Sequence, residues 1–140
     1  MFKFRLASIM RLKEYKEQLC RDEVAKCLQL YNLEVHREIA LKEQLIHLEK
    51  EIEQCQEGEI DVPVLMRQQS YRSFIKTSII EQKQLVAFRQ NQLDLAKQKM
   101  IEAMKDKKVL QKLREKKYQE FLYEQDKKEQ ALQDELANRK

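Results

Sequence analysis

The stretch Glu57-Gly58-Glu59-Ile60-Asp61-Val62-Pro63 decides the fold, because it holds the one glycine and the one proline among 140 residues. Turns depend on such residues for their particular backbone angles, so a single cluster of them indicates a single chain reversal. Gly58 suits the C-terminal cap of a helix, and Asp61 and Pro63 suit the start of the next one. A connection this short places two helices side by side and antiparallel.

The sequence on either side of this stretch has the composition of long helices. Glu, Lys, Gln, Leu and Arg are abundant, and charged residues make up 37% of the chain. These residues are good helix formers, and such a mixture is typical of coiled coils. The sequence therefore predicts an all-α fold in which two long helices form an antiparallel coiled-coil hairpin. It is expected to be one domain over residues 1–140, with helix 1 at about 4–56, a reversal near 57–65 and helix 2 at about 66–137.

Apolar residues recur every three or four positions in both segments, as in one stripe of a helix. The first stripe comprises Val24, Leu28, Tyr31, Val35 and Ile39, followed by Leu41, Leu45, Leu48, Ile52 and Cys55. The change of phase between Ile39 and Leu41 predicts a stutter in the coiled coil. The second stripe begins at Ile75 and Ile79. Because the second segment is longer, we expect Leu6 to lie across from Lys116 and roughly the last twenty residues to extend unpaired.

Several classes of function find no support in the residues. Charges of both signs largely cancel to a net charge of +4, which argues against nucleic-acid binding. There is no apolar run long enough to cross a bilayer, no continuous apolar core of a secretory signal, and no nucleotide-binding or hydrolase motif. His36 and His47 are about 16 Å apart along a helix, too far for one metal ion. We expect no enzymatic activity, no cofactor, no metal and three reduced cysteines.

Three segments are candidates for contact with other proteins. Residues 97–117 contain nine basic and three acidic residues, which fits either a solvated face or attraction to an acidic protein surface. The apolar and basic N-terminus fits either packing against the second helix near Leu113 to Leu122 or docking into a partner. Tyr71 and Phe74 fit either the seam or an exposed contact site.

Three motifs give the chain a family resemblance. The opening Phe2-Lys-Phe-Arg-Leu-Ala-Ser-Ile-Met-Arg-Leu-Lys13 combines aromatic, basic and leucine residues, and the second helix starts with Tyr71-Arg-Ser-Phe-Ile-Lys-Thr77. Near the end come Arg114-Glu-Lys-Lys117 and Glu129-Gln-Ala-Leu-Gln-Asp-Glu-Leu-Ala137. Over nearly its whole length the chain resembles the FliJ family, the soluble coiled-coil component of the bacterial flagellar type III export apparatus.

The resemblance implies a role that composition does not. Members of this family look like the central stalk of rotary ATPases. They insert in and promote the hexameric ring of the export ATPase, contact the membrane export-gate protein and escort export chaperones. Such a protein is needed for flagellum assembly and motility, and it is cytoplasmic and peripherally associated with the inner membrane. A substrate-binding export chaperone and a generic coiled-coil scaffold are the alternatives.

The resemblance also suggests site residues, which we state as expectations. Contact with the export gate is expected at Tyr71, Phe74 and Ile75, although Ser78 and Glu81 depart from the apolar pattern of that face. Contact with the ATPase ring is expected at Phe4, Arg5, Lys112, Arg114, Lys116 and Lys117. The C-terminal family motif is represented by Gln130, Asp134 and Glu135.

Overall fold

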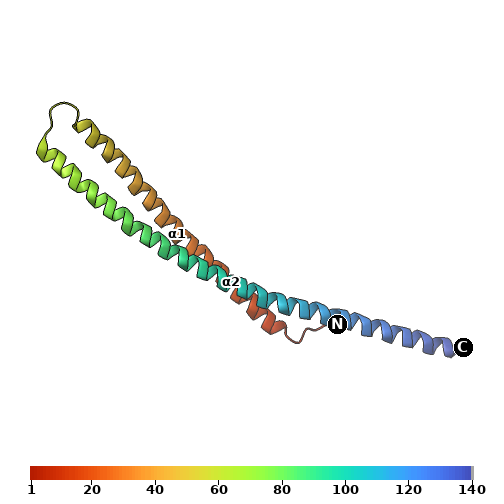
Figure 1. Ribbon diagram of the computed structural model, residues 1–140. Coiled ribbons are helices and arrows are strands. Elements are labelled where there is room, and N and C mark those ends of the chain that lie inside the picture. Colours follow the sequence, from red (N-terminus) through yellow and green to blue (C-terminus); the bar gives the residue numbers. More distant parts are fainter. Residues whose placement is uncertain (140) are drawn as a thin grey trace. The chain divides into compact units, whose positions relative to one another are not determined.

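The computed structural model describes residues 1–139 and contains two helices, α1 (Ala7–Cys55) and α2 (Val62–Asn138). Within the described residues there is no strand, so the predicted all-α fold is confirmed. The helices pack against each other in antiparallel directions and are joined by one loop, as Figure 1 shows. The chain divides into two compact units: Glu23–Lys97, here called the loop unit, and Met1–Asp22 with Gln98–Lys140, here called the end unit.

The reversal is shorter than predicted and occupies residues 56–61. Gly58 has a φ of 88°, the left-handed region that glycine adopts without strain and that commonly ends a helix. Asp61 caps α2, since its carbonyl accepts from Leu65 N at 3.0 Å and its carboxylate lies 3.5 Å from Val64 N. This cap starts α2 at Val62, ahead of the expected residue 66, with Pro63 in its first turn.

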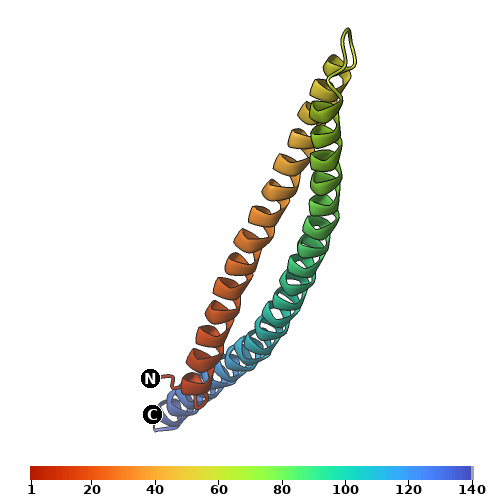
Figure 2. The same cartoon turned by 90° about the vertical axis from the view of Figure 1, so that its left-hand side faces the viewer.

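In the loop unit the two helices meet along one seam (Figure 2). The core next to the loop consists of Leu48, Ile52, Ile75 and Ile79, flanked by Leu41, Leu45 and Leu65. A second core consists of Cys27, Leu93 and Ala96, with Val24 and Tyr31 packed against it. The buried and half-buried positions of α1 continue in steps of three and four from Val24 through Cys27, Tyr31, Glu34, Glu38 and Leu41 to Ile52.

This register corrects the predicted stutter. Leu28 and Ile39, expected in the seam, are 42% and 46% exposed. Their places in the seam are taken by Cys27, which is buried, and Glu38, which is half-buried, and Glu34 rather than Val35 is the buried residue between them. The heptad pattern therefore runs without a change of phase, and the apparent slip arose because two seam positions hold carboxylates rather than apolar side chains.

Glu34 is stabilised by a partner on the other helix. Gln82 Nε2 donates to the carbonyl oxygen of Glu34 at 2.9 Å and also to its carboxylate. Arg37 Nη1 adds an ion pair to the same carboxylate at 3.1 Å. Both Glu34 and Gln82 are less than 10% exposed, so a polar layer separates the two apolar cores of the loop unit. A buried polar pair of this kind favours one register over slipped alternatives.

We predict that Gln82→Leu lowers the free energy of unfolding by about 1–3 kcal/mol, because the buried backbone carbonyl and the buried carboxylate of Glu34 each lose a cross-helix hydrogen bond. Urea denaturation followed by circular dichroism measures this change. Gln84→Leu, at an exposed position of the same helix, is the matched control. The double variant Glu34→Leu/Gln82→Leu should recover the lost stability, since apolar replacement removes the buried carboxylate that has lost its cross-helix donor. Unchanged stability in Gln82→Leu would refute a role for this layer.

Candidate contact surfaces

In the end unit, an aromatic cluster joins the N-terminal segment to α2. The Phe2 ring lies edge-on to Tyr118, with ring centroids 5.2 Å apart, and is tilted against Phe121 at 5.5 Å. Because Phe2 holds residues 1–6 against α2, α1 begins at Ala7 rather than at the expected residue 4. This contact confirms the predicted packing of the N-terminus near Leu113 to Leu122. A docking role for the same segment stays a prediction.

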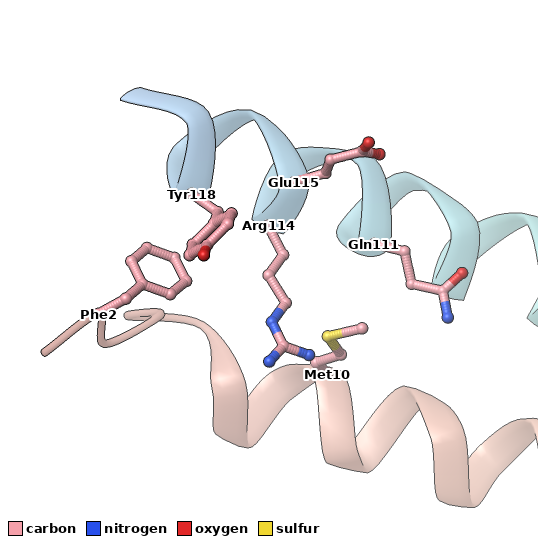
Figure 3. Close-up of a pocket in the computed structure, with 6 residues that line it drawn as sticks. All are labelled: Phe2, Met10, Gln111, Arg114, Glu115 and Tyr118. Carbon is pink, nitrogen blue, oxygen red and sulfur yellow. The ribbon is translucent and has the colours of Figure 1, made fainter. Parts of the chain in front are cut away.

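Several of the residues predicted to contact the ATPase ring line hollows around this cluster. Phe4, Arg5 and Lys117 line one hollow with a volume of about 820 Å³, and Leu6 and Leu113 line it too, as the predicted register requires. Phe4 and Arg114 line a second hollow. Arg114 and Met10 also line a third hollow, where the Arg114 side chain extends from α2 towards α1, as Figure 3 shows. Lys112 and Lys116 are exposed on the same helix. The hollows are lined by apolar and basic side chains, together with Glu120 and Glu124, and Lys117 forms an ion pair with Glu120 at 3.4 Å.

Ion pairs fasten the two helices of the end unit next to this surface. Glu17 is buried at a seam position, and its carboxylate lies 2.9 Å from Lys107 Nζ and 2.7 Å from Arg21 Nη2. The Lys107 hydrogen bond, helped by Arg21, holds the pKa of Glu17 below its ordinary value despite the burial. Lys13 lies 3.7 Å from Asp106. Neither cross-helix ion pair was predicted from the sequence, although the recurrence of charged residues at heptad positions could have indicated both.

The pair predicts a pH dependence of stability. The folded-state pKa of Glu17 lies below its unfolded-state pKa, so the ion pair stabilises the fold above the unfolded pKa. That contribution is lost as the pH falls through the folded pKa. Glu17→Gln should therefore be less stable than the unaltered chain at pH 7, and the difference should shrink at pH 3 to 4. Urea denaturation across this range tests it, with exposed Glu14→Gln as control; a pH-independent difference would contradict it.

The predicted gate-contact residues separate into two groups. Tyr71 and Phe74 are 50% and 66% exposed, and their rings stack with centroids 6.3 Å apart. Ile75 is only 1% exposed and belongs to the core next to the loop. Its burial leaves Ile75 to position the helix rather than to touch a partner directly. Ser78 is half-buried and Glu81 exposed, so the outward apolar face here is a pair of aromatic rings.

The end of α2 extends without a covering helix. Every residue from Leu122 to Arg139 is exposed, in line with the expected unpaired end, and Gln130, Asp134 and Glu135 lie there. Glu135 forms an ion pair with Arg139 at 3.3 Å. We call residues 122–138 the tail.

The cysteine and histidine side chains described here lie either in the core or on the surface, outside any candidate site. Burial raises the pKa of the Cys27 thiol, which packs in the second core of the loop unit. His47 lies on the surface, 3.1 Å from Glu51. Residues 1–139 hold no group of three or more His, Cys, Asp or Glu side chains arranged for a metal ion. Neither helix has, within those residues, a stretch long and apolar enough to span a membrane.

These features define a class of protein: an antiparallel two-helix hairpin that presents aromatic and basic side chains on its surface. A family model described as flagellar FliJ protein matches residues 2–140, so the chain belongs to the FliJ family, and it is a component of flagellar type III export.

One solved structure supports the fold. A chain from Chlamydia trachomatis, CT670, described as a YscO homolog, superposes with a TM-score of 0.56 and 14% sequence identity. The match covers 99% of this chain and 94% of that one. A comparison with curated proteins gave no match. At this identity the likeness concerns the fold alone.

Proposed function

We propose that this chain is the stalk-like component of the export ATPase and that its end unit contacts the ATPase ring. The observation that carries the proposal is the Phe2 cluster, which brings Phe4 and Arg5 of the N-terminus beside Lys117 of α2. Residues that lie far apart in sequence thereby form one surface that combines apolar and basic side chains with Glu120 and Glu124. Exposed basic side chains attract an acidic partner at long range while each screened contact stays weak, which suits a component that must move within a ring.

The proposal extends to the other partners and to the location of the protein. Tyr71 and Phe74 are the proposed contact with the export-gate membrane protein, because exposed aromatic side chains are frequent centres of binding energy. Escort of export chaperones, a cytoplasmic location and peripheral association with the inner membrane follow from family membership as parts of the same proposal. An export chaperone remains the second candidate, favoured by the apolar hollows beside Phe4.

The ATPase activity of the cognate export ATPase, measured over an enzyme concentration series with and without this chain, tests the stalk role. We expect a rise in rate that is largest where the ring is partly assembled. Changing Lys112, Arg114, Lys116 and Lys117 together to Glu should abolish the rise, because four basic side chains of this part of α2 become acidic. Changing Lys16, Lys50, Lys76 and Lys83 to Glu is the matched control. A rate unaffected by the unaltered chain, with no binding, would favour the chaperone or scaffold alternatives.

The gate contact is tested by binding to the purified cytoplasmic domain of the export-gate protein. Phe74→Glu should weaken binding at least about tenfold, since it places a charge at the centre of an apolar contact. Met66→Glu, an exposed apolar position on the same helix, serves as the control. Equal affinity of both variants and the unaltered chain would place the gate contact elsewhere.

A further inference from the structure

Beside the polar layer of the loop unit, apolar side chains are exposed on the outward faces of both helices. Between the Glu34–Gln82 hydrogen bonds and the packing of Cys27 on Leu93, residues 28–33 of α1 lie alongside residues 83–92 of α2. At this level Leu33, Leu85 and Phe88 are 46%, 42% and 52% exposed. Next to the polar layer the half-buried seam positions Tyr31 and Val86 are apolar, and further apolar groups face outward. We call Leu33, Leu85 and Phe88 the outer band. Adjacent exposed apolar residues mark contact sites more strongly than scattered ones.

Two arginines border the outer band. Arg37 has a side chain 58% exposed, although its guanidinium also pairs with Glu34. Arg89 lies over the Phe88 ring, 5.6 Å from its centroid, and donates to Gln92 through Nη1. The Nε of Arg89 is buried without a hydrogen-bond partner among the described residues. Glu81 is an exposed carboxylate one heptad nearer the loop. The band therefore suits an apolar helix face that carries acidic side chains to meet Arg37 and Arg89.

The tail is a helix of that kind. Leu122, Leu132 and Leu136 are 39%, 59% and 54% exposed, and their spacing puts them within one face of α2. Residues 122–138 carry five acidic side chains against two basic ones. Where the seam positions continue past Phe121 they hold charged or small residues, so the apolar face of the tail is not a continuation of the seam. The tail thus has an apolar stripe of its own with nothing in the chain packed on it within the described residues.

We propose that the tail of one copy of this protein docks on the outer band of a second copy. The contact joins an acidic amphipathic helix to an apolar patch bordered by arginines, so charge and apolar surface match on both sides. The tail and two residues of the band, Leu85 and Phe88, lie on the same helix, α2. Such an interface is heterologous, because each copy offers a band and a tail that are different surfaces. It does not depend on the proposed contacts with the ATPase ring or the gate.

Analytical ultracentrifugation of the full chain tests this proposal. The average mass of the unaltered protein should rise with concentration in the micromolar range and fall back on adding salt, which screens the charges. Phe88→Glu and Leu132→Glu should each weaken association at least about tenfold, since each places a charge in the apolar contact. Ile46→Glu, at a position 55% exposed on α1, is the matched control and should associate like the unaltered chain. Circular dichroism checks that all variants keep their helices.

Mixing the two variants separates this interface from any symmetric one. Phe88→Glu retains a normal tail and Leu132→Glu retains a normal band, so an equimolar mixture should form one-to-one dimers and stop there. Failure of the mixture to associate while the unaltered chain does would mean that like surfaces pair, and the proposal would be wrong. Self-association of either variant at the unaltered level, or a monomeric unaltered chain at every concentration, would overturn it as well.

Discussion

A fold of two helices has one seam, and this constraint governs every other feature of the chain. Only side chains at the inward heptad positions can be removed from water, and the helices have no third layer to cover their outer faces. Apolar residues beyond those positions stay exposed, as Phe74, Phe88 and Leu95 do. The surface of the protein therefore exposes many large apolar side chains along both helices.

Because there is only one seam, each polar residue in it has a large effect on how the two helices align. Glu34 with Gln82 and Glu17 with Lys107 replace apolar layers that would add stability. Their value lies in selectivity, because a slipped register would leave a buried carboxylate without its donor, at a cost of several kcal/mol. Repetitive heptads alone distinguish poorly between registers. The charged layers tie each helix to one alignment and so fix which residues meet at the Phe2 cluster.

Much of the fold was predictable from the sequence because the chain contains one clear turn signal. Gly58, Asp61 and Pro63 identified a single reversal, and helix-forming composition supplied the rest. The helix ends were misplaced by a few residues, since the capping strength of Asp61 and the anchoring of Phe2 depend on contacts that local patterns do not display. The stutter was wrong for a related reason: a rule that seeks apolar residues skips Glu34, whose burial depends on a partner 48 positions away.

The candidate sites were predictable only in part. Packing of the N-terminus on α2 followed from the antiparallel register and is confirmed. The outward position of Tyr71 and Phe74 and the inward position of Ile75 were not separable beforehand, because adjacent residues of a helix differ by only 100° and the phase was uncertain. Residues that meet partner proteins carry no such internal signal, and their assignments rest on family resemblance and remain proposals.

The division of the loop unit into two apolar cores has a consequence for how the chain folds. The core next to the loop joins residues separated by about 20 positions, as Ile52 and Ile75 are, whereas Cys27 and Leu93 are separated by about 70. Closing the shorter loop costs about 1 kcal/mol less conformational entropy. Structure should thus nucleate beside the turn and zip outward, crossing the polar layer before the second core forms. Opening would proceed in reverse, from the second core back towards the turn.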